Sequence, residues 1–447
     1  MRRNLVLGVG LAIFVIATLL PTPADLSPAG QRALALFALC TAGWIGRPVN
    51  PAITGLAGLS LLPILGIVPK SEVFGHFGTE ALFFLIGLFV FASATLNSGL
   101  IGHLFEKFLK RCDQGENALS LGTLLVSFGL SACMLSQVIA TAVLPVLLER
   151  TRAIGNGNHG RFASRLLGSM AFGVALGGCV TFLAGPQNIL AAELGSLITG
   201  ENLRAWSHIQ VALPLSLVSL PIAYFVLRRS FGTEGISPTV IRDGMNDSTT
   251  PSLRREGRTV GFVLATTIGC VAFFADHVSI AAVMLTGMTA LFMTRTTQWK
   301  HLEDWVPWGT LLVYGSAFTL AMVLHETGAA TWLGNVLLPG HDLPAFLLVG
   351  VITWCAMAAT ALSGHPGISV ILLPFGLDAA ARFGIHGADL VAPTAIAAGL
   401  GVMLTSRTPA TAMIIGTGII DPRDILRHGW LLAHVLWSIL VASFFVW

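Results

Sequence analysis

Charged residues are scarce in this 447-residue chain: they make up 11% of it, while hydrophobic residues make up 54%. A soluble globular protein carries roughly 25% charged residues. A soluble fold of this length could not bury so much apolar surface, because its exterior needs polar cover. The composition therefore excludes a soluble enzyme, a nucleic-acid-binding protein and a disordered scaffold, and indicates a polytopic membrane protein.

Motifs that mark nucleic-acid binding, disulfides or catalysis are also missing. The formal net charge is only +3, too small to indicate a nucleic-acid partner. The 6 cysteines form no CxxC pair, so we interpret them as small apolar residues and not as disulfides or metal ligands. HExxH and GxSxG do not occur, which argues against an enzyme that works within the membrane. We expect no cofactor other than a coupling ion.

What the chain does contain is a series of long apolar runs. They are continuous over about 17–25 residues, the length at which a helix crosses a bilayer, and do not alternate as barrel strands would. The first run, residues 5–20, follows two arginines and resembles either a signal peptide or a retained span. No clear cleavage site follows it, which favours a retained span. The runs predict an all-α polytopic membrane protein with about eleven transmembrane helices.

Four of the apolar runs are interrupted by polar residues, glycine or proline. Ser136-Gln137 and residues 364–367 split two runs into pairs of half-helices, whereas residues 184–188 and 405–409 break single spans. We interpret the first two as tips of re-entrant hairpins. With the N-terminus in the cytoplasm and the C-terminus outside, most of the 25 lysines and arginines then fall in cytoplasmic loops, as the positive-inside rule requires. If either hairpin is counted as a full span, all later loops change sides and the excess of lysine and arginine in cytoplasmic loops is lost.

The interruptions recur in the same order in two halves of the chain. The same number of residues separates Gly99 from Pro145 and Gly328 from Pro374. The first half begins with a span that runs inward and the second with a span that runs outward, so we predict two repeats of inverted topology. The expected organisation is scaffold helices at 1-79, the first repeat at 80-229, a cytoplasmic linker at 230-256, connecting scaffold helices at 257-306 and the second repeat at 307-447.

Broken helices at membrane depth point to a shared binding site. Unpaired backbone groups are costly in hydrocarbon, so such breaks persist only where protein covers them or where they line a wet cavity. Half-helix N-termini attract anions, and free carbonyls coordinate cations. We therefore expect the four breaks to meet near the membrane midplane, around an anion site with one or more neighbouring cation sites.

Side chains at the breaks leave several roles open. Ser136 and Gln137 offer uncharged groups to a carboxylate or sulfate-like anion, or they merely cap two half-helices. His365 is the counterpart of Ser136 in the second repeat; it donates to an anion, titrates with transported protons, or satisfies a carbonyl in a tight turn. Arg407 carries a fixed charge to membrane depth. Its planar guanidinium group can hold a carboxylate or sulfonate through two hydrogen bonds. Alternatively, the side chain reaches the cytoplasmic surface or forms a structural contact within the protein.

Four segments around the breaks carry a resemblance to a known family. They are the span EALFFLIGLFVFASATLNSGLIGHL, the hairpin SACMLSQVIATAVLPVLL, and the broken helices FGVALGGCVTFLAGPQNIL and GVMLTSRTPATAMIIGTGIIDPRDILRHG. They resemble the divalent anion/sodium symporter family (DASS) of the ion transporter superfamily. The resemblance implies a homodimeric, elevator-type transporter of the inner membrane that moves dicarboxylates, citrate or sulfate with sodium.

The side chains at the breaks, taken together with the resemblance, predict two sets of contacts. The expected substrate-binding residues are Ser136, Gln137, Val138, Asn188, Gly364, His365, Arg407, Thr408 and Pro409. The expected sodium ligands are Ser131, Ser136, Gly185 and Asn188 in the first half and, more weakly supported, Thr360 and Ser363 in the second.

The chain departs from the family pattern at both hairpins. The family's Ser-Asn-Thr signature is Ser136-Gln137-Val138 here, and Thr411 replaces the asparagine of the second broken helix. These losses put the usual dicarboxylate and the second sodium site in doubt. We hypothesise that Arg407 stands beside the anion in place of a sodium ion.

The predicted function is secondary transport of a small anion, either di- or tricarboxylate-like or sulfate- or sulfonate-like, coupled to sodium. The alternative is a cation/proton antiporter or a metalloid-anion exporter on the same fold. That alternative needs an aspartate or glutamate at membrane depth as a proton carrier, and none occurs at the four breaks.

Overall fold

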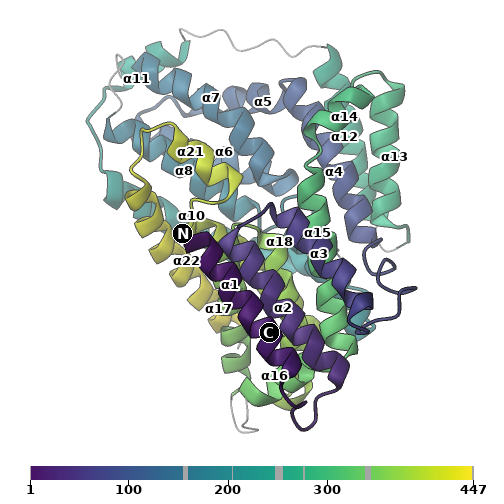
Figure 1. Ribbon diagram of the computed structural model, residues 1–447. Coiled ribbons are helices and arrows are strands. Elements are labelled where there is room, and N and C mark those ends of the chain that lie inside the picture. Colours follow the sequence, from purple (N-terminus) through teal and green to yellow (C-terminus); the bar gives the residue numbers. More distant parts are fainter. Residues whose placement is uncertain are drawn as a thin grey trace.

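The computed structural model describes residues 2–154, 160–203, 205–246, 255–274, 277–337 and 344–444. Within these ranges every regular element is a helix and no strand occurs (Figure 1), which confirms the all-α prediction. Seven of the described helices are long and apolar enough to cross a bilayer, and four shorter apolar helices accompany them. The figure of about eleven spans stays a prediction.

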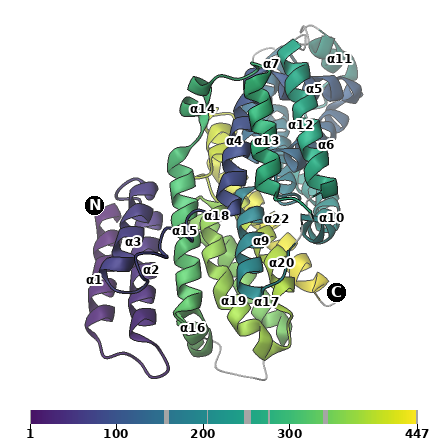
Figure 2. The same cartoon turned by 90° about the vertical axis from the view of Figure 1, so that its right-hand side faces the viewer.

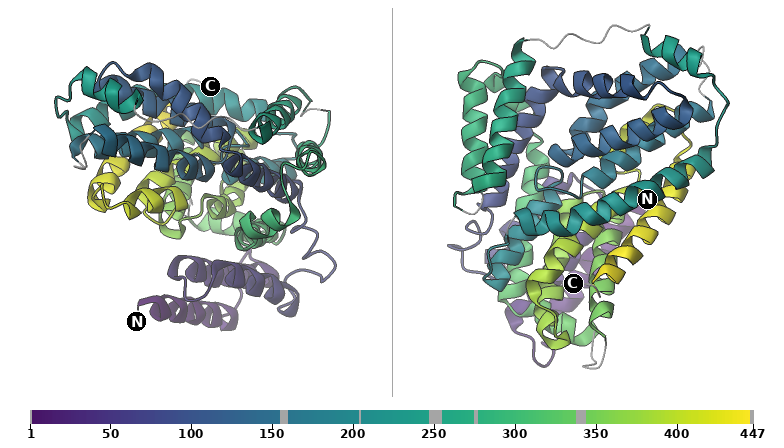
Figure 3. Two further views of the ribbon diagram at one scale, coloured as in Figure 1. Left: turned by 90° about the horizontal axis from the view of Figure 1, so that it is seen from above. Right: turned by 180° about the vertical axis from the view of Figure 1, so that it is seen from behind.

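Three N-terminal helices form a group at one side of the molecule. Figure 2 and the left view of Figure 3 show this purple group standing beside α15, against which α2 and α3 pack. The first of these helices coincides with the apolar run at residues 5–20. The group consists of α1 (Arg2–Leu19), α2 (Pro28–Gly46) and α3 (Pro51–Ile64).

The first predicted repeat contains seven helices. Its apolar opening run is not one continuous helix, because Gly99 adopts a left-handed backbone with φ of 69° and turns the chain after Asn97. The elements are α4 (Glu80–Asn97), α5 (Leu100–Leu109), the 3-10 turn η1 (Lys110–Cys112), α6 (Glu116–Cys133), α7 (Ser136–Ile154), α8 (Arg161–Gly177), α9 (Pro186–Thr199) and α10 (Ala205–Phe231).

The second predicted repeat follows the same order. Gly328, with φ of 72°, makes the turn that Gly99 makes in the first. The elements are α15 (Trp308–Glu326), α16 (Ala329–Leu337), α17 (Ala345–Ser363), α18 (Pro366–Ser369), η2 (Val370–Leu372), α19 (Leu373–Ala380), η3 (Ala381–Phe383), α20 (Gly387–Leu400), η4 (Gly401–Leu404), α21 (Pro409–Gly416) and α22 (Pro422–Ser443).

The opening helices of the two halves run in opposite directions. In Figure 2, α4 rises to α5 at the top of the molecule, whereas α15 descends to α16 at the bottom. The right view of Figure 3 shows the long α10 crossing the back of the molecule beside the yellow α22, with which it packs. The arrangement is the one that inverted repeats produce.

Four helices lie between the two halves. The predicted linker at 230-256 is not wholly irregular, since α11 lies inside it; its residues 247–254 lie outside the described ranges. The predicted domain boundaries remain predictions. The connecting helices are α11 (Pro238–Asn246), α12 (Arg255–Phe274), α13 (Ile280–Met293) and α14 (Trp299–Trp305).

Close helix packing repeats between the two halves and depends on glycine. A Cβ added at Gly177 would fall against the carbonyl oxygen of Phe128 and the side chain of Ser131, closer than real Cβ atoms come. A Cβ at Gly401 would meet the Met357 carbonyl oxygen at 2.5 Å. Each glycine ends or follows the first part of a broken helix, and each carbonyl belongs to the helix before a hairpin tip. The hairpin and the broken helix of each half therefore touch backbone to backbone.

A buried ion pair holds the far end of the first hairpin. Arg150 on α7 donates to the carboxylate of Glu106 on α5 and to the carbonyl oxygen of Gly244 on α11, the latter at 3.2 Å. Both charged side chains are almost fully buried. The pair joins α5, α7 and α11 at one end of the molecule.

Removing this arginine should destabilise the protein. Arg150→Met leaves the Glu106 carboxylate buried without its cation, and breaking such a pair costs about 3–5 kcal/mol. Thermal unfolding in detergent measures the loss. Arg152→Met, at an exposed position of the same helix, serves as the control and should unfold like the parent. Equal melting temperatures for the two variants would contradict the assigned role.

Candidate functional site

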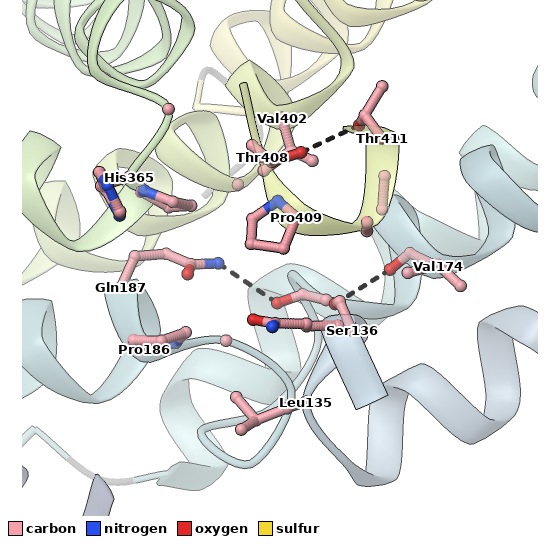
Figure 4. A pocket seen from close by; sticks show the side chains of 18 of the residues that line it. Leu135, Ser136, Val174, Pro186, Gln187, His365, Val402, Thr408, Pro409 and Thr411 are labelled. Carbon is pink, nitrogen blue, oxygen red and sulfur yellow. Dashed lines mark hydrogen bonds between the residues drawn. The ribbon is translucent and has the colours of Figure 1, made fainter. Parts of the chain in front are cut away.

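A cavity of about 140 Å³ lies where the four helix breaks meet. Figure 4 shows Ser136, Gln187, His365 and Thr408 around this space, each from a different break. The sequence prediction that the breaks gather around one space is therefore confirmed. The break residues that line the cavity are Leu135, Ser136, Gln137, Ala184, Gly185, Pro186, Gln187, Gly364, His365, Pro366, Thr408, Pro409, Ala410 and Thr411.

Helices begin at the cavity from all four breaks. Helix α7 begins at Ser136, while α9 and α21 begin at Pro186 and Pro409. Proline suits this first helical position, because its ring fixes a helical φ and the N–H that it lacks would have no partner within the helix. Unpaired N–H groups and the positive end of the helix dipole then face the cavity. The arrangement favours a negatively charged ligand.

The lining itself is mostly uncharged. Apolar side chains such as Phe89, Phe172 and Met403 form much of the wall. Among the described residues that line the cavity, none is Asp, Glu, Lys or Arg, and the titratable ones are His365 and Tyr314. The cavity therefore attracts an anion through helix ends and hydrogen-bond donors, without a fixed cation in its wall.

Oxygen atoms of the first half converge beside the cavity. The Ser131 and Ser136 hydroxyls are 2.9 Å apart, and both contact the carbonyl oxygen of Val174, at 2.9 and 3.2 Å. The Ser136 hydroxyl also lies 3.3 Å from the carbonyl oxygen of Ala184. The oxygens come from the end of α6, the start of α7, the last turn of α8 and the unwound segment that follows α8. Hydroxyls and carbonyl oxygens gathered at half-helix ends suit a small cation such as sodium.

Asn188 adds a buried acceptor behind this cluster. Its amide nitrogen donates to the carbonyl oxygens of Gly178, at 3.1 Å, and Thr181, at 2.7 Å, and so holds the unwound segment. Its Oδ1 is buried and has no hydrogen-bond partner among the described residues. Gly178 packs against the Ser136 hydroxyl so tightly that a Cβ would collide with it. A buried acceptor without a donor, next to a cluster of oxygens, fits a cation.

A histidine supports the unwound segment from outside. His208 on α10 is buried, and its Nε2 lies 2.9 Å from the carbonyl oxygen of Cys179. The Thr181 hydroxyl donates to the carbonyl oxygen of Ala132 at 2.6 Å and joins the segment to the end of α6. These contacts fix the carbonyls that surround the oxygen cluster.

The matching groups of the second half bond to one another. The Thr360 hydroxyl lies 2.6 Å from the Ser369 hydroxyl, and Thr408 donates to Thr411 over 2.9 Å. The Ser363 hydroxyl accepts from the backbone N–H of His365 at 3.2 Å. Hydroxyl pairs therefore occur in both halves, and the halves differ in the partnerless acceptor: among the described residues, none of these second-half side chains has a counterpart to the buried Asn188 Oδ1.

Three predicted substrate contacts lie away from the cavity. Val138 and Asn188 are buried next to the lining residues Gln137 and Gln187, and neither lines the space. Arg407 is exposed, and its Nη1 donates to the carbonyl oxygen of Leu362 at 2.5 Å. Its side chain turns toward the end of α17, as the alternative of structural pairing expects, and the hypothesis that Arg407 stands beside the anion stays a prediction.

Other cavity residues were missed by sequence reasoning. Thr310 and Tyr314 reach the cavity from α15, an unbroken apolar helix without a local signal. Gln187 was seen at its break but not chosen as a ligand; its amide nitrogen donates to the Gly178 carbonyl oxygen at 3.3 Å. A polar residue directly after Pro186 is the signal that could have identified it.

Comparison with known proteins decides the family. The model of a family described as "Citrate transporter" matches residues 34–401. This chain belongs to the citrate transporter family. The match is consistent with the resemblance to the divalent anion/sodium symporters, and the protein is a multi-pass membrane transporter and not an enzyme.

Individual relatives of this citrate transporter family member are distant but match it over nearly their full length. It is 23% identical to the sodium-dependent dicarboxylate transporter SdcS of Staphylococcus saprophyticus subsp. saprophyticus, over 98% of this chain and 90% of the relative. It is 22% identical to SdcS of Staphylococcus aureus, over 94% of this chain and 86% of the relative.

Two solved transporter structures share the fold of this citrate transporter family member. Neisseria gonorrhoeae MtrF, from a class of antimetabolite efflux pumps, has a TM-score of 0.60 at 13% identity and covers 100% of this chain and 94% of its own. The Alcanivorax borkumensis YdaH transporter has a TM-score of 0.54 at 12% identity, over 100% and 97% of the two chains. At these identities the likeness concerns the fold alone.

Proposed function

We propose that the protein is a secondary active transporter of a small anion, di- or tricarboxylate-like or sulfate- or sulfonate-like, driven by sodium across the inner membrane. The observation that carries the proposal is the meeting of helix starts and an oxygen cluster at one cavity. Two relatives named sodium-dependent dicarboxylate transporters support the same substrate class.

The anion binds where the helix starts and neutral donors point into the cavity. Gln137 and Gln187 offer amide donors from the first half, and His365 offers a ring N–H from the second. Such groups recognise a carboxylate or oxyanion without a salt bridge, and the N-termini of α7, α9 and α21 supply positive potential.

Sodium binds at the oxygen cluster of the first half. Its ligands are the Ser131 and Ser136 hydroxyls, the carbonyl oxygens of Val174 and Ala184, and Asn188 Oδ1. Ser136 belongs to the cluster and also lines the cavity. A cation held by Ser136 orders the same hairpin tip that meets the anion, and each ligand therefore strengthens the binding of the other.

The inverted halves suggest how the site reaches both sides of the membrane. Hairpins and broken helices carry the cavity past the N-terminal and connecting helices, in an elevator movement within a homodimer. The N-terminus faces the cytoplasm and the C-terminus the outside, as the distribution of Lys and Arg in the loops favours.

Uptake into proteoliposomes tests this function. We expect an inward sodium gradient to drive accumulation of labelled citrate, succinate or sulfate, with counterflow of the transported anion as a carrier requires. Ser131→Ala should weaken sodium activation about tenfold, because a lost polar contact costs roughly 1–3 kcal/mol. Ser230→Ala, whose hydroxyl only donates within α10, is the control. Unchanged uptake in sodium-free buffer would exclude sodium symport.

A further inference from the structure

We propose that only the first repeat binds a transported cation, and that Arg47 and Arg407 supply fixed positive charge where the second repeat would hold another. One cation would then cross the membrane with each anion. The proposal rests on the proposed function, because it concerns the coupling ion of the same site.

Two matched halves would ordinarily hold two matched cation sites. In transporters with broken helices, half-helix C-terminal ends and unwound carbonyls coordinate the coupling cation. The end of α6 beside Ser131 corresponds to the end of α17 beside Thr360, since Gly177 and Gly401 pack against these helices in the same way. The end of α17 is therefore where a second cation would bind.

Two guanidinium groups already occupy the end of α17. Arg47 donates to the carbonyl oxygen of Ser363, and Arg407 donates to that of Leu362 at 2.5 Å. A Cβ added at Gly364 would lie 2.9 Å from Arg47 Nη2 and 2.7 Å from the Cβ of Arg407. Positive charge at a helix C-terminus stabilises the helix. A sodium ion beside Thr360, in the last turn of the same helix, would lie near both charges, and it would be repelled.

The hydroxyls that a second cation needs are also engaged. Thr360 is bonded to Ser369 and Thr408 to Thr411. In the first half the Ser131 and Ser136 hydroxyls are also bonded to each other, but both contact the Val174 carbonyl oxygen as well, and Asn188 Oδ1 is buried without a partner among the described residues. Thr411 stands where the first half has Asn188, two residues after the proline that starts the helix, so the amide acceptor is missing as well.

The positive charge at the end of α17 comes partly from Arg47, which lies outside the second repeat. Arg47 follows α2, where its left-handed backbone with φ of 48° ends the helix. Arg407 donates in the opposite direction, to the carbonyl oxygen of Ile45 in α2 at 3.3 Å. The ends of α2 and α17 are thus joined directly by Arg47 and bridged by Arg407, which donates to both. An N-terminal helix that occurs once in the chain explains why two repeats of the same design differ here.

Sodium stoichiometry tests the proposal directly. Isothermal titration of the purified full-length chain with sodium chloride, against choline chloride, should give one sodium ion per chain. The flux ratio of labelled sodium to labelled anion in proteoliposomes should give one sodium per anion. Ser131→Ala should weaken sodium binding about tenfold in this titration, and Thr360→Ala should leave it unchanged. Two ions per chain, or equal weakening by both variants, would overturn the proposal.

The arginines have a test of their own. Arg407→Gln should lower the maximal uptake rate at saturating sodium, Arg407→Lys should restore part of it, and neither should change the sodium concentration for half-maximal binding. Normal uptake by Arg407→Gln would refute the role of its charge. Sodium titration and uptake by the parent protein together distinguish failure of the proposed function from failure of this inference. No sodium binding and no anion uptake would overturn the proposed function itself, whereas two bound sodium ions with intact uptake would overturn only this inference.

Discussion

Replacing Gln137 with glutamate should abolish anion uptake while the protein still folds. Gln137 lines the cavity in the first turn of α7, and its side chain is exposed there. A carboxylate at this point is favoured by the helix N-terminus and repels the incoming anion. Two unit charges about 4 Å apart interact by about 4 kcal/mol at an effective dielectric constant of about 20, which corresponds to roughly a thousandfold loss of affinity.

The measurement is initial uptake of labelled anion together with the melting temperature in detergent. Gln298→Glu makes the same change of charge at an exposed position before α14, outside the described spans. This control should transport at the parent rate. Uptake by Gln137→Glu within a few-fold of the control would show that the anion binds elsewhere.

Placing a methyl group at Gly177 should prevent correct folding. The added Cβ would overlap with the backbone carbonyl oxygen of Phe128. A helix backbone cannot move away by a change of rotamer, as a flexible side chain can. Overpacking by a methylene costs typically 1–3 kcal/mol even where side chains give way. Because Ser131 lies against the same glycine, any protein that does fold should also lose the geometry of the sodium ligands. We expect little monodisperse protein from Gly177→Ala.

Gly129→Ala provides the matched control for this variant. Gly129 lies in α6, one residue beyond Phe128, and a Cβ there would meet nothing within 4 Å. Alanine is a better helix former than glycine by about 1 kcal/mol, so the control should be as stable as the parent or slightly more so. Yield and chromatographic profile decide the comparison. Wild-type behaviour of Gly177→Ala would mean that α6 and α8 do not pack this closely.

The helices and their breaks could be predicted because their signals are local. Apolar runs of membrane length, interrupted at Ser136, Pro186 and Pro409, fix where most helices start and stop. Their order also revealed the two halves. The prediction of one continuous span through Gly99 was wrong, because hydrophobicity alone does not record the left-handed backbone at a glycine, and the predicted linker contains the helix α11.

The directions of side chains at the breaks could not be predicted in the same way. Arg407 lies at the break that the sequence predicts, but its side chain points toward α2. Its neighbours in sequence do not indicate that it donates to the carbonyl oxygens of Ile45 and Leu362. Arg47 resembled any cytoplasmic loop cation. Tyr314 entered the cavity from an unbroken span. Each of these positions depends on contacts between segments hundreds of residues apart.

The glycine contacts between hairpin and broken helix have a thermodynamic consequence. With backbones touching at Gly177 and Gly401, neither hairpin tip can swing away as an independent flap. In the proposed sodium-coupled carrier, the same side chains would then bind the anion from either face of the bilayer with similar intrinsic affinity. The sodium gradient would set the direction of net transport, and reversing that gradient should reverse the transport.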